Sequence, residues 1–140
     1  MVHENPIIRL LKQDKRYSLA AYRFVQEGLS YAQSELDYGT VHWQEESEQH
    51  ERHVSAQELC EGLKQFGISQ YGYMAKVVLN AWGVYTTDDF GAIVYNLIET
   101  KLMKQSDSDH PEDFNDLYDF EVTFCKQFRF AGESSVRSSS

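Results

Sequence analysis

The sequence has few cysteines, no long apolar run and no targeting segment at its start. Its two cysteines, Cys60 and Cys125, are too few for a disulfide framework. No apolar stretch approaches the roughly 20 residues that a membrane-spanning helix needs. The N-terminus Met-Val-His-Glu-Asn-Pro lacks the basic and apolar regions of a signal peptide. Together these absences predict a reduced, cytoplasmic protein with no membrane segment.

Positive charge is also scarce, because 13 Lys and Arg stand against 22 Asp and Glu and give a formal net charge of −9. Nucleic acids and anionic membranes attract positive fields, so we expect no general binding to either and no appreciable binding to duplex DNA at physiological salt. The basic 9–23 segment is the exception, with Asp14 as its one acid. It contains Arg9, Lys12, Lys15, Arg16 and Arg23.

The signatures of common enzyme classes are missing as well. The chain contains no G-x-S-x-G elbow, no Walker loop and no G-x-G-x-x-G fingerprint. Cys60 falls on the apolar face of a predicted helix, where a free cysteine behaves as a small hydrophobic residue. The sequence therefore predicts no catalytic residue, no cofactor-binding residue and no cofactor.

Three histidines lie in an acidic segment that deserves comparison with metal sites. His42, His50 and His53 flank the glutamates of residues 45–51, and imidazole and carboxylate groups bind zinc, nickel or copper. The order His50-Glu51-Arg52-His53 lacks the spacing of H-E-x-x-H, in which the histidines are four apart. We therefore interpret the segment as a solvated acidic loop and predict no strong transition-metal site.

A second acidic stretch, Asp107-Ser108-Asp109, begins like a calcium-binding loop. The sixth position of an EF-hand loop is glycine and the twelfth is glutamate, but here they are Glu112 and Tyr118. An acid-rich turn that contains Pro111 is the better interpretation.

Apolar periodicity is abundant and predicts a mainly α fold, a compact single-domain helical structure. Asn5-Pro6 is a typical helix start and predicts a short helix over 6–13. Apolar residues at steps of three and four predict a long helix over 16–36. Further helices are expected over 56–70, 73–82 and 88–103.

The last three predicted helices have clear ends. Ser55 and Glu58 form a capping box, and Gly83 suits the left-handed residue after a helix. The 73–82 helix is apolar over much of its circumference, so we expect it to be largely buried. One shared core is predicted for Leu63, Phe66, Val78, Trp82, Phe90, Val94 and Leu97.

Two segments leave a choice between helix and strand. Alternation at Val41 and Trp43 predicts a short strand, followed over 44–53 by an exposed loop or a helix extension. Residues 117–129 fit either type, and we favour a helix over 120–129 capped by Asp119. Pairing of 102–104 with 117–119 would add a small β-hairpin, a winged-helix-like element. We expect one domain over 1–130, with 37–53 as an acidic loop within it, and a disordered tail over 131–140.

A series of motifs covers most of residues 10–130. It includes Ala21-Tyr22-Arg23-Phe24-Val25, the run that begins at His53-Val54-Ser55, Asn80-Ala81-Trp82-Gly83-Val84, and Asp88 to Leu97. In this series the chain resembles a family of short uncharacterised bacterial proteins found chiefly in planctomycetes and verrucomicrobia. Ala56 and Cys60 replace an expected Gly and Leu, and the acidic insert at 44–52 is longer. The family has no assigned activity, so the resemblance implies one domain and transfers no catalytic residue.

These observations favour a non-enzymatic cytoplasmic protein-interaction or regulatory module that binds an unidentified protein or forms a homodimer. The alternative is a nucleic-acid-associated helix-turn-helix-like protein, in which Arg9, Lys12 and Arg16 of the basic 9–23 segment touch phosphates. Its second helix would carry Asp88, Asp89 and Glu99, which suit a groove reader poorly. A small metal-dependent hydrolase is the third hypothesis.

Overall fold

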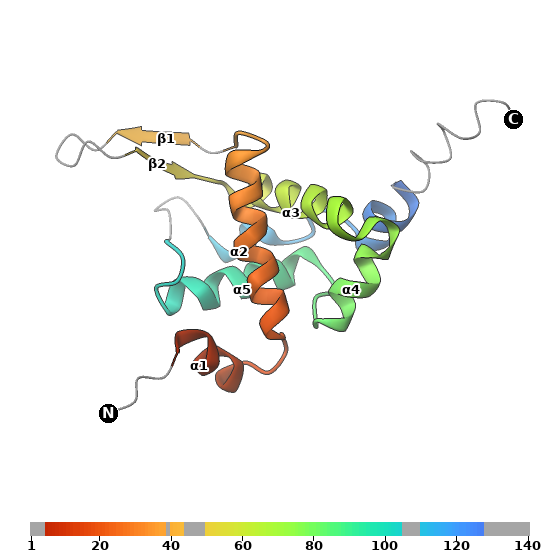
Figure 1. The fold of residues 1–140 in the computed structure, drawn as a ribbon, viewed down its shortest axis with the longest axis horizontal. Helices are drawn as coiled ribbons and strands as arrows, with labels where there is room; N and C mark the ends of the chain where they lie inside the picture. The colour runs from red at the N-terminus through yellow and green to blue at the C-terminus, as the bar shows by residue number, and fades with distance from the viewer. Residues whose placement is uncertain (1–4, 39, 44–49, 105–109, 128–140) are drawn as a thin grey trace, which may run out of the picture.

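The computed structural model of the chain describes residues 5–38, 40–43, 50–104 and 110–127. Its two longest helices, α2 (Leu19–Ser34) and α3 (Ala56–Tyr71), pack against each other (Figure 1). A Cβ atom added to Gly62 would stand 2.7 Å from the Cβ atom of Ala32, closer than real Cβ contacts. A larger residue at this position would therefore push the two helices apart.

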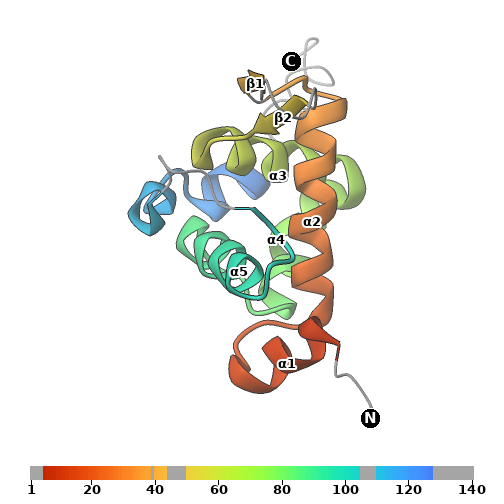
Figure 2. The same cartoon turned by 90° about the vertical axis from the view of Figure 1, so that its left-hand side faces the viewer.

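The first helix, α1 (Pro6–Gln13), has the predicted bounds. Asn5 Oδ1 accepts a hydrogen bond from Ile7 N at 2.9 Å and caps it. The next helix, α2, begins at Leu19 instead of residue 16, because Ser18 is extended and its side chain caps the helix. It ends at Ser34 instead of residue 36. Figure 2 shows α1 at one end of the molecule, beyond the start of α2.

A small antiparallel hairpin joins β1 (Thr40–Trp43) to β2 (His50–His53). The strand predicted at 41–43 is confirmed. The expectation of a loop or helix extension over 44–53 is wrong for residues 50–53, since His50 pairs with Trp43 and Glu51 with His42. Residues 44–49 lie outside the described part of the chain.

The prediction of a winged-helix-like hairpin is wrong, because residues 102–104 and 117–119 form no strand. The backbone of this region bonds to side chains instead: Leu117 N donates to Thr87 Oγ1 at 3.1 Å, and Asp116 N donates to Asp88 Oδ1 at 3.1 Å. Thr87 is completely buried, so the first bond fixes the segment to the start of α5.

The remaining elements follow α3 in order. They are the 3₁₀-helix η1 (Gly72–Met74), α4 (Ala75–Ala81), α5 (Thr87–Glu99), the 3₁₀-helix η2 (Pro111–Phe114) and the π-helix η3 (Glu121–Gln127). The Ser55–Glu58 capping box is present, with both bonds at 3.0–3.1 Å. The helical choice for 120–129 is confirmed as far as Gln127, and residues 128–129 lie outside the described part of the chain. The predicted cap is also confirmed, because Val122 N donates to Asp119 Oδ1 at 3.0 Å.

The turn between α4 and α5 depends on Gly83, whose φ is +96°. Gly83 N and Val84 N donate to the carbonyls of Asn80 and Leu79 at 3.0 and 2.9 Å, which are the paired bonds of a left-handed helix end. The predicted role of Gly83 is therefore confirmed.

The predicted end of α5 at residue 103 is wrong, because the helix stops at Glu99. Lys101 takes a left-handed φ of 64°, and Leu102 N donates back to Leu97 O at 2.9 Å. Leu102 therefore continues the apolar spacing of α5 in the sequence, but it lies beyond the end of the helix and is 36% exposed.

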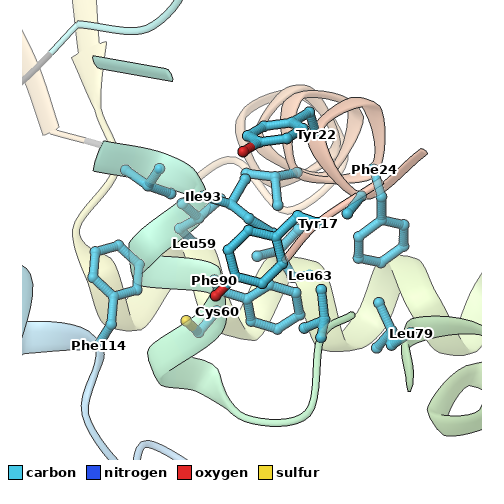
Figure 3. Close-up of a cluster of buried hydrophobic side chains, with 14 of the residues drawn as sticks. Tyr17, Tyr22, Phe24, Leu59, Cys60, Leu63, Leu79, Phe90, Ile93 and Phe114 are labelled. Atoms are coloured by element: carbon cyan, nitrogen blue, oxygen red, sulfur yellow. The ribbon is translucent and has the colours of Figure 1, made fainter. Parts of the chain in front are cut away.

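The core lies among α2, α3, α5 and the C-terminal segment, and it is rich in aromatic rings (Figure 3). Of the predicted core, Leu63, Phe90, Val94 and Leu97 are buried, while Phe66 and Trp82 pack partly exposed against them and Val78 is half-buried. The mainly α, single-domain prediction is confirmed. No helix in the described ranges has the length and hydropathy to cross a bilayer.

Candidate functional site

The surface of η1 and α4 is unusually apolar. Tyr73, Met74 and Val77 are 67%, 47% and 57% exposed. Ala75 and Leu79 on the opposite side of the same turns are completely buried. The prediction that this helix is largely buried is therefore wrong. The helix is short and packs against α3 and η3, so one side remains in solvent although its residues are apolar.

The π-helix η3 extends this surface. It packs beside both η1 and α4, and Figure 1 shows it next to them. Lys76 Nζ pairs with Glu121 Oε2 at 3.2 Å, which joins α4 to the start of η3. Val122 is 44% exposed. We call Tyr73, Met74, Val77 and Val122 the apolar stripe.

Exposed carboxylates border the apolar stripe where η3 begins. Asp119 accepts the backbone N–H of Val122, so the cap of the helix joins an acid directly to the stripe. Asp116 and Asp119 also line a hollow of about 210 Å³ beside Tyr85, whose side chain is exposed. We call Asp116, Asp119 and Glu121 the acidic flank.

The apolar stripe rests on a well-packed base. The Trp82 ring at the end of α4 lies 5.8 Å from the Tyr71 ring and 5.7 Å from that of the buried Phe24. Below η1 and α4, a Cβ atom on Gly67 would be in contact with both Phe124 and Ala75, so these elements are already at packing distance. The exposed apolar side chains are therefore presented by fixed backbone.

Other polar groups stabilise the fold instead of forming a reactive site. Asp14 accepts bonds from Arg16 Nη2 at 2.7 Å and Asn96 Nδ2 at 3.0 Å, and Asn96 also donates to Tyr22 Oη. The bond from Arg16 lowers the pKa of Asp14 well below its usual value. This network ties the α1–α2 linker to α5.

The carboxylate of Asp89, at the start of α5, is also occupied by hydrogen bonds within the fold. It accepts bonds from Tyr17 Oη at 2.6 Å and from the backbone N–H groups of Tyr85 and Thr86. Burial, and then the bond to Asp89, raise the pKa of the Tyr17 hydroxyl above its usual value. Asp89 thus caps the helix, as an acid at a helix N-terminus commonly does.

Cys60 lies at a hollow of about 300 Å³ that Lys64 and Tyr118 also line. Tyr118 Oη donates to the carbonyl of Cys60 at 2.7 Å. The Cys60 side chain is 1% exposed, and burial raises the pKa of its thiol well above the usual value. A nucleophilic cysteine needs the opposite shift, so this geometry fits the predicted hydrophobic role.

The metal hypotheses fall mostly outside what the structure describes. Asp107 and Asp109 of the calcium-like stretch are outside the described residues, and of His42, His50 and His53 only the backbone pairing is defined. Within the described part of the chain, no group of His, Cys, Asp and Glu gathers as a metal site would. The absence of a strong metal site stays a prediction.

The helix-turn-helix hypothesis requires α5 to enter a DNA groove. Instead α5 packs among α2, α3 and η2, with Phe90 and Ile93 in the core (Figure 3). These two residues and Leu97 are completely buried. In the basic 9–23 segment, Arg9 is exposed, whereas Arg16 makes two side-chain bonds to Asp14. The weak DNA binding expected from the sequence stays a prediction, and this packing supports it.

Comparison of the chain with protein-family models, curated proteins and solved structures finds no match. The resemblance to the planctomycete and verrucomicrobial family is thus an expectation without independent support. The sequence analysis missed the apolar stripe because its residues have the same spacing as core residues.

Proposed function

We propose that the chain is a non-enzymatic protein-interaction module that binds a protein partner through the apolar stripe. The observation that carries this proposal is the exposure of Tyr73, Met74 and Val77 on one side of η1 and α4. Isolated exposed apolar residues are common on proteins, but a group of large ones on adjacent elements is typical of an interaction surface. Tyr and Met are also enriched in the centres of such surfaces.

The rigid base of the stripe supports the same proposal. Binding costs less when the contacting side chains are already held by ordered backbone. Ala75 and Leu79 anchor α4 in the interior while Val77 points out, so the helix needs no rearrangement to meet a partner. The buried thiol of Cys60 and the engaged carboxylates of Asp14 and Asp89 favour this function over a hydrolase.

The test is to exchange one exposed apolar residue for a charge. Tagged protein with Val77→Asp is compared with the wild type in native-cell extract, and captured proteins are quantified by mass spectrometry. Ile8→Asp is the matched control, because Ile8 is 47% exposed but lies on α1. We expect at least one reproducible partner that Val77→Asp loses and Ile8→Asp keeps.

A result against the proposal is equally clear. If the wild type and both variants capture the same proteins in the same amounts, the stripe does not mediate binding. Circular dichroism melts of all three proteins establish that any loss reflects the surface and not unfolding.

A further inference from the structure

We infer that the apolar stripe and the acidic flank together bind a cationic amphipathic helix, a protein segment whose apolar face is bordered by Lys and Arg. This inference rests on the proposed function and specifies the chemistry of the partner. It follows from the direct contact between the two surfaces. Asp119 bonds to the backbone of Val122, and Glu121 pairs with the neighbour of Val77.

The segment that leads into η3 carries charge of one sign. Residues 111–121 contain five acids and no Lys or Arg. Asp116 and Asp119 are exposed, and Lys76 is already paired with Glu121. An approaching cation would therefore meet the exposed carboxylates of Asp116 and Asp119 next to the stripe, and such complementarity increases association rate and selectivity.

The basic part of the same chain does not neutralise the acidic flank. Figures 1 and 2 show α1 well apart from η3, with α5 and α4 between them in the fold. Within the linker that follows α1, Arg16 is bonded to Asp14. Within the described residues, α1 and the linker after it therefore do not supply a positive charge to Asp116 and Asp119, and we infer that the partner supplies it.

The shape of the surface favours a helix as the occupant. The apolar stripe is formed by helical turns, whose ridges pack into those of another helix. A second copy joined stripe to stripe would place two acidic flanks together, and each chain already has a net charge of −9. Like charges across such a contact oppose it. A cationic helix from a different protein would be repelled neither by the acidic flank nor by the net charge of the chain.

The experiment measures fluorescence anisotropy of labelled peptides with the full-length protein. The probe is an amphipathic peptide of Leu and Lys, about 16 residues and thus about 24 Å long as a helix. One control peptide has the same composition in an order that spreads Leu around the helix, and another has Glu in place of Lys. We expect the probe to bind at least about tenfold more tightly than either control, a difference in free energy of about 1.4 kcal/mol.

Protein variants separate the two parts of the site. Val77→Asp is expected to weaken probe binding about tenfold, a size typical of a central interface contact. The triple variant Asp116→Asn, Asp119→Asn and Glu121→Gln is expected to flatten the salt dependence between about 50 and 300 mM NaCl. Its matched control removes three exposed acids of α2 and the residues after it, Glu27→Gln, Glu35→Gln and Asp37→Asn.

Several outcomes would overturn the inference. Equal binding of the Lys and Glu peptides, no binding of the probe, or equal effects of the two triple variants would each exclude a cationic partner at this site. If sedimentation equilibrium shows that the protein alone self-associates and Val77→Asp prevents it, the occupant is a second copy. In these cases a partner captured from extract through Val77 would leave the proposed function intact, so the two failures are distinguishable.

Discussion

The helices α4 and α5 are both rich in apolar residues and are joined by one turn, yet they are used differently. Phe90, Ile93 and Leu97 of α5 are completely buried, whereas Met74 just before α4 and Val77 within it are about half exposed. Packing against α2, α3 and η2 accounts for the apolar residues of α5. The fold does not require those on the outer side of α4. Apolar residues beyond the needs of packing are the ones that indicate an interaction surface.

This comparison predicts different losses of stability when side chains of the two helices are replaced. Leu97→Ala should have the largest effect, because its side chain is completely buried in the common core. The lost burial and the cavity should lower the free energy of unfolding by about 2–5 kcal/mol. Urea denaturation followed by circular dichroism measures this loss. A change below about 1 kcal/mol would mean that α5 is not the central helix described here.

The turn between the two helices should be the next most sensitive position. Gly83 has φ +96°, and a Cβ atom there would stand 1.9 Å from the carbonyl oxygen of Arg16, which is backbone and cannot rotate away. Gly83→Ala should therefore lower the free energy of unfolding by about 2–3 kcal/mol, the sum of a left-handed conformation and a displaced linker.

The control for Gly83 is Gly67→Ala, because Gly67 is helical and the nearest heavy atom to an added Cβ is 3.4 Å away. We expect this variant to lose much less stability than Gly83→Ala in the same denaturation experiment. Equal losses would show that the turn geometry is not the cause.

The third prediction concerns the linker between α1 and α2, which Asp14 connects to Asn96 of α5. Bonds from Arg16 hold the pKa of Asp14 below its unfolded value, so Asp14 contributes stability above the unfolded pKa and loses it as pH falls toward the folded pKa. Asp14→Asn should cost about 1 kcal/mol at neutral pH and flatten the loss of stability below about pH 4. Thermal melts from pH 7 to pH 3 test this. An acid limb identical to that of the wild type would assign the acid sensitivity to other carboxylates.

Local signals made much of the fold predictable, and long-range contacts explain the rest. The caps at Asn5, Ser55 and Asp119 join groups two or three residues apart, so their spacing is visible in the sequence. The bond from Asn96 to Asp14 joins residues 82 apart, and that from Leu117 to Thr87 joins residues 30 apart. No local pattern specifies such pairs. The bond from Leu117 to Thr87 attaches to α5 the segment that the sequence had predicted to pair with residues 102–104.

The candidate site was missed for a related reason. Periodicity shows which residues share a side of a helix, but not whether another element covers that side. In α5 the apolar side is also the covered side, because α2, α3 and η2 pack against it. For α4, the inner residue Leu79 is covered and the outer residue Val77 is not. The distinction depends on where η3 packs, which the sequence of α4 does not contain.

The smallest stability effect should come from the variant with the largest effect on binding. Val77 is 57% exposed and is the third residue of α4, where an acid interacts favourably with the helix dipole. Val77→Asp should therefore change the free energy of unfolding by no more than about 0.5 kcal/mol, since Val and Asp have similar helix propensity. Urea denaturation of this variant beside Leu79→Ala, which empties a completely buried position on the same helix, makes the comparison within α4. Leu79→Ala should lose about 2–5 kcal/mol. A loss for Val77→Asp that approaches that of Leu79→Ala would show that the outer side of α4 belongs to the core and would remove the apolar stripe as a binding surface.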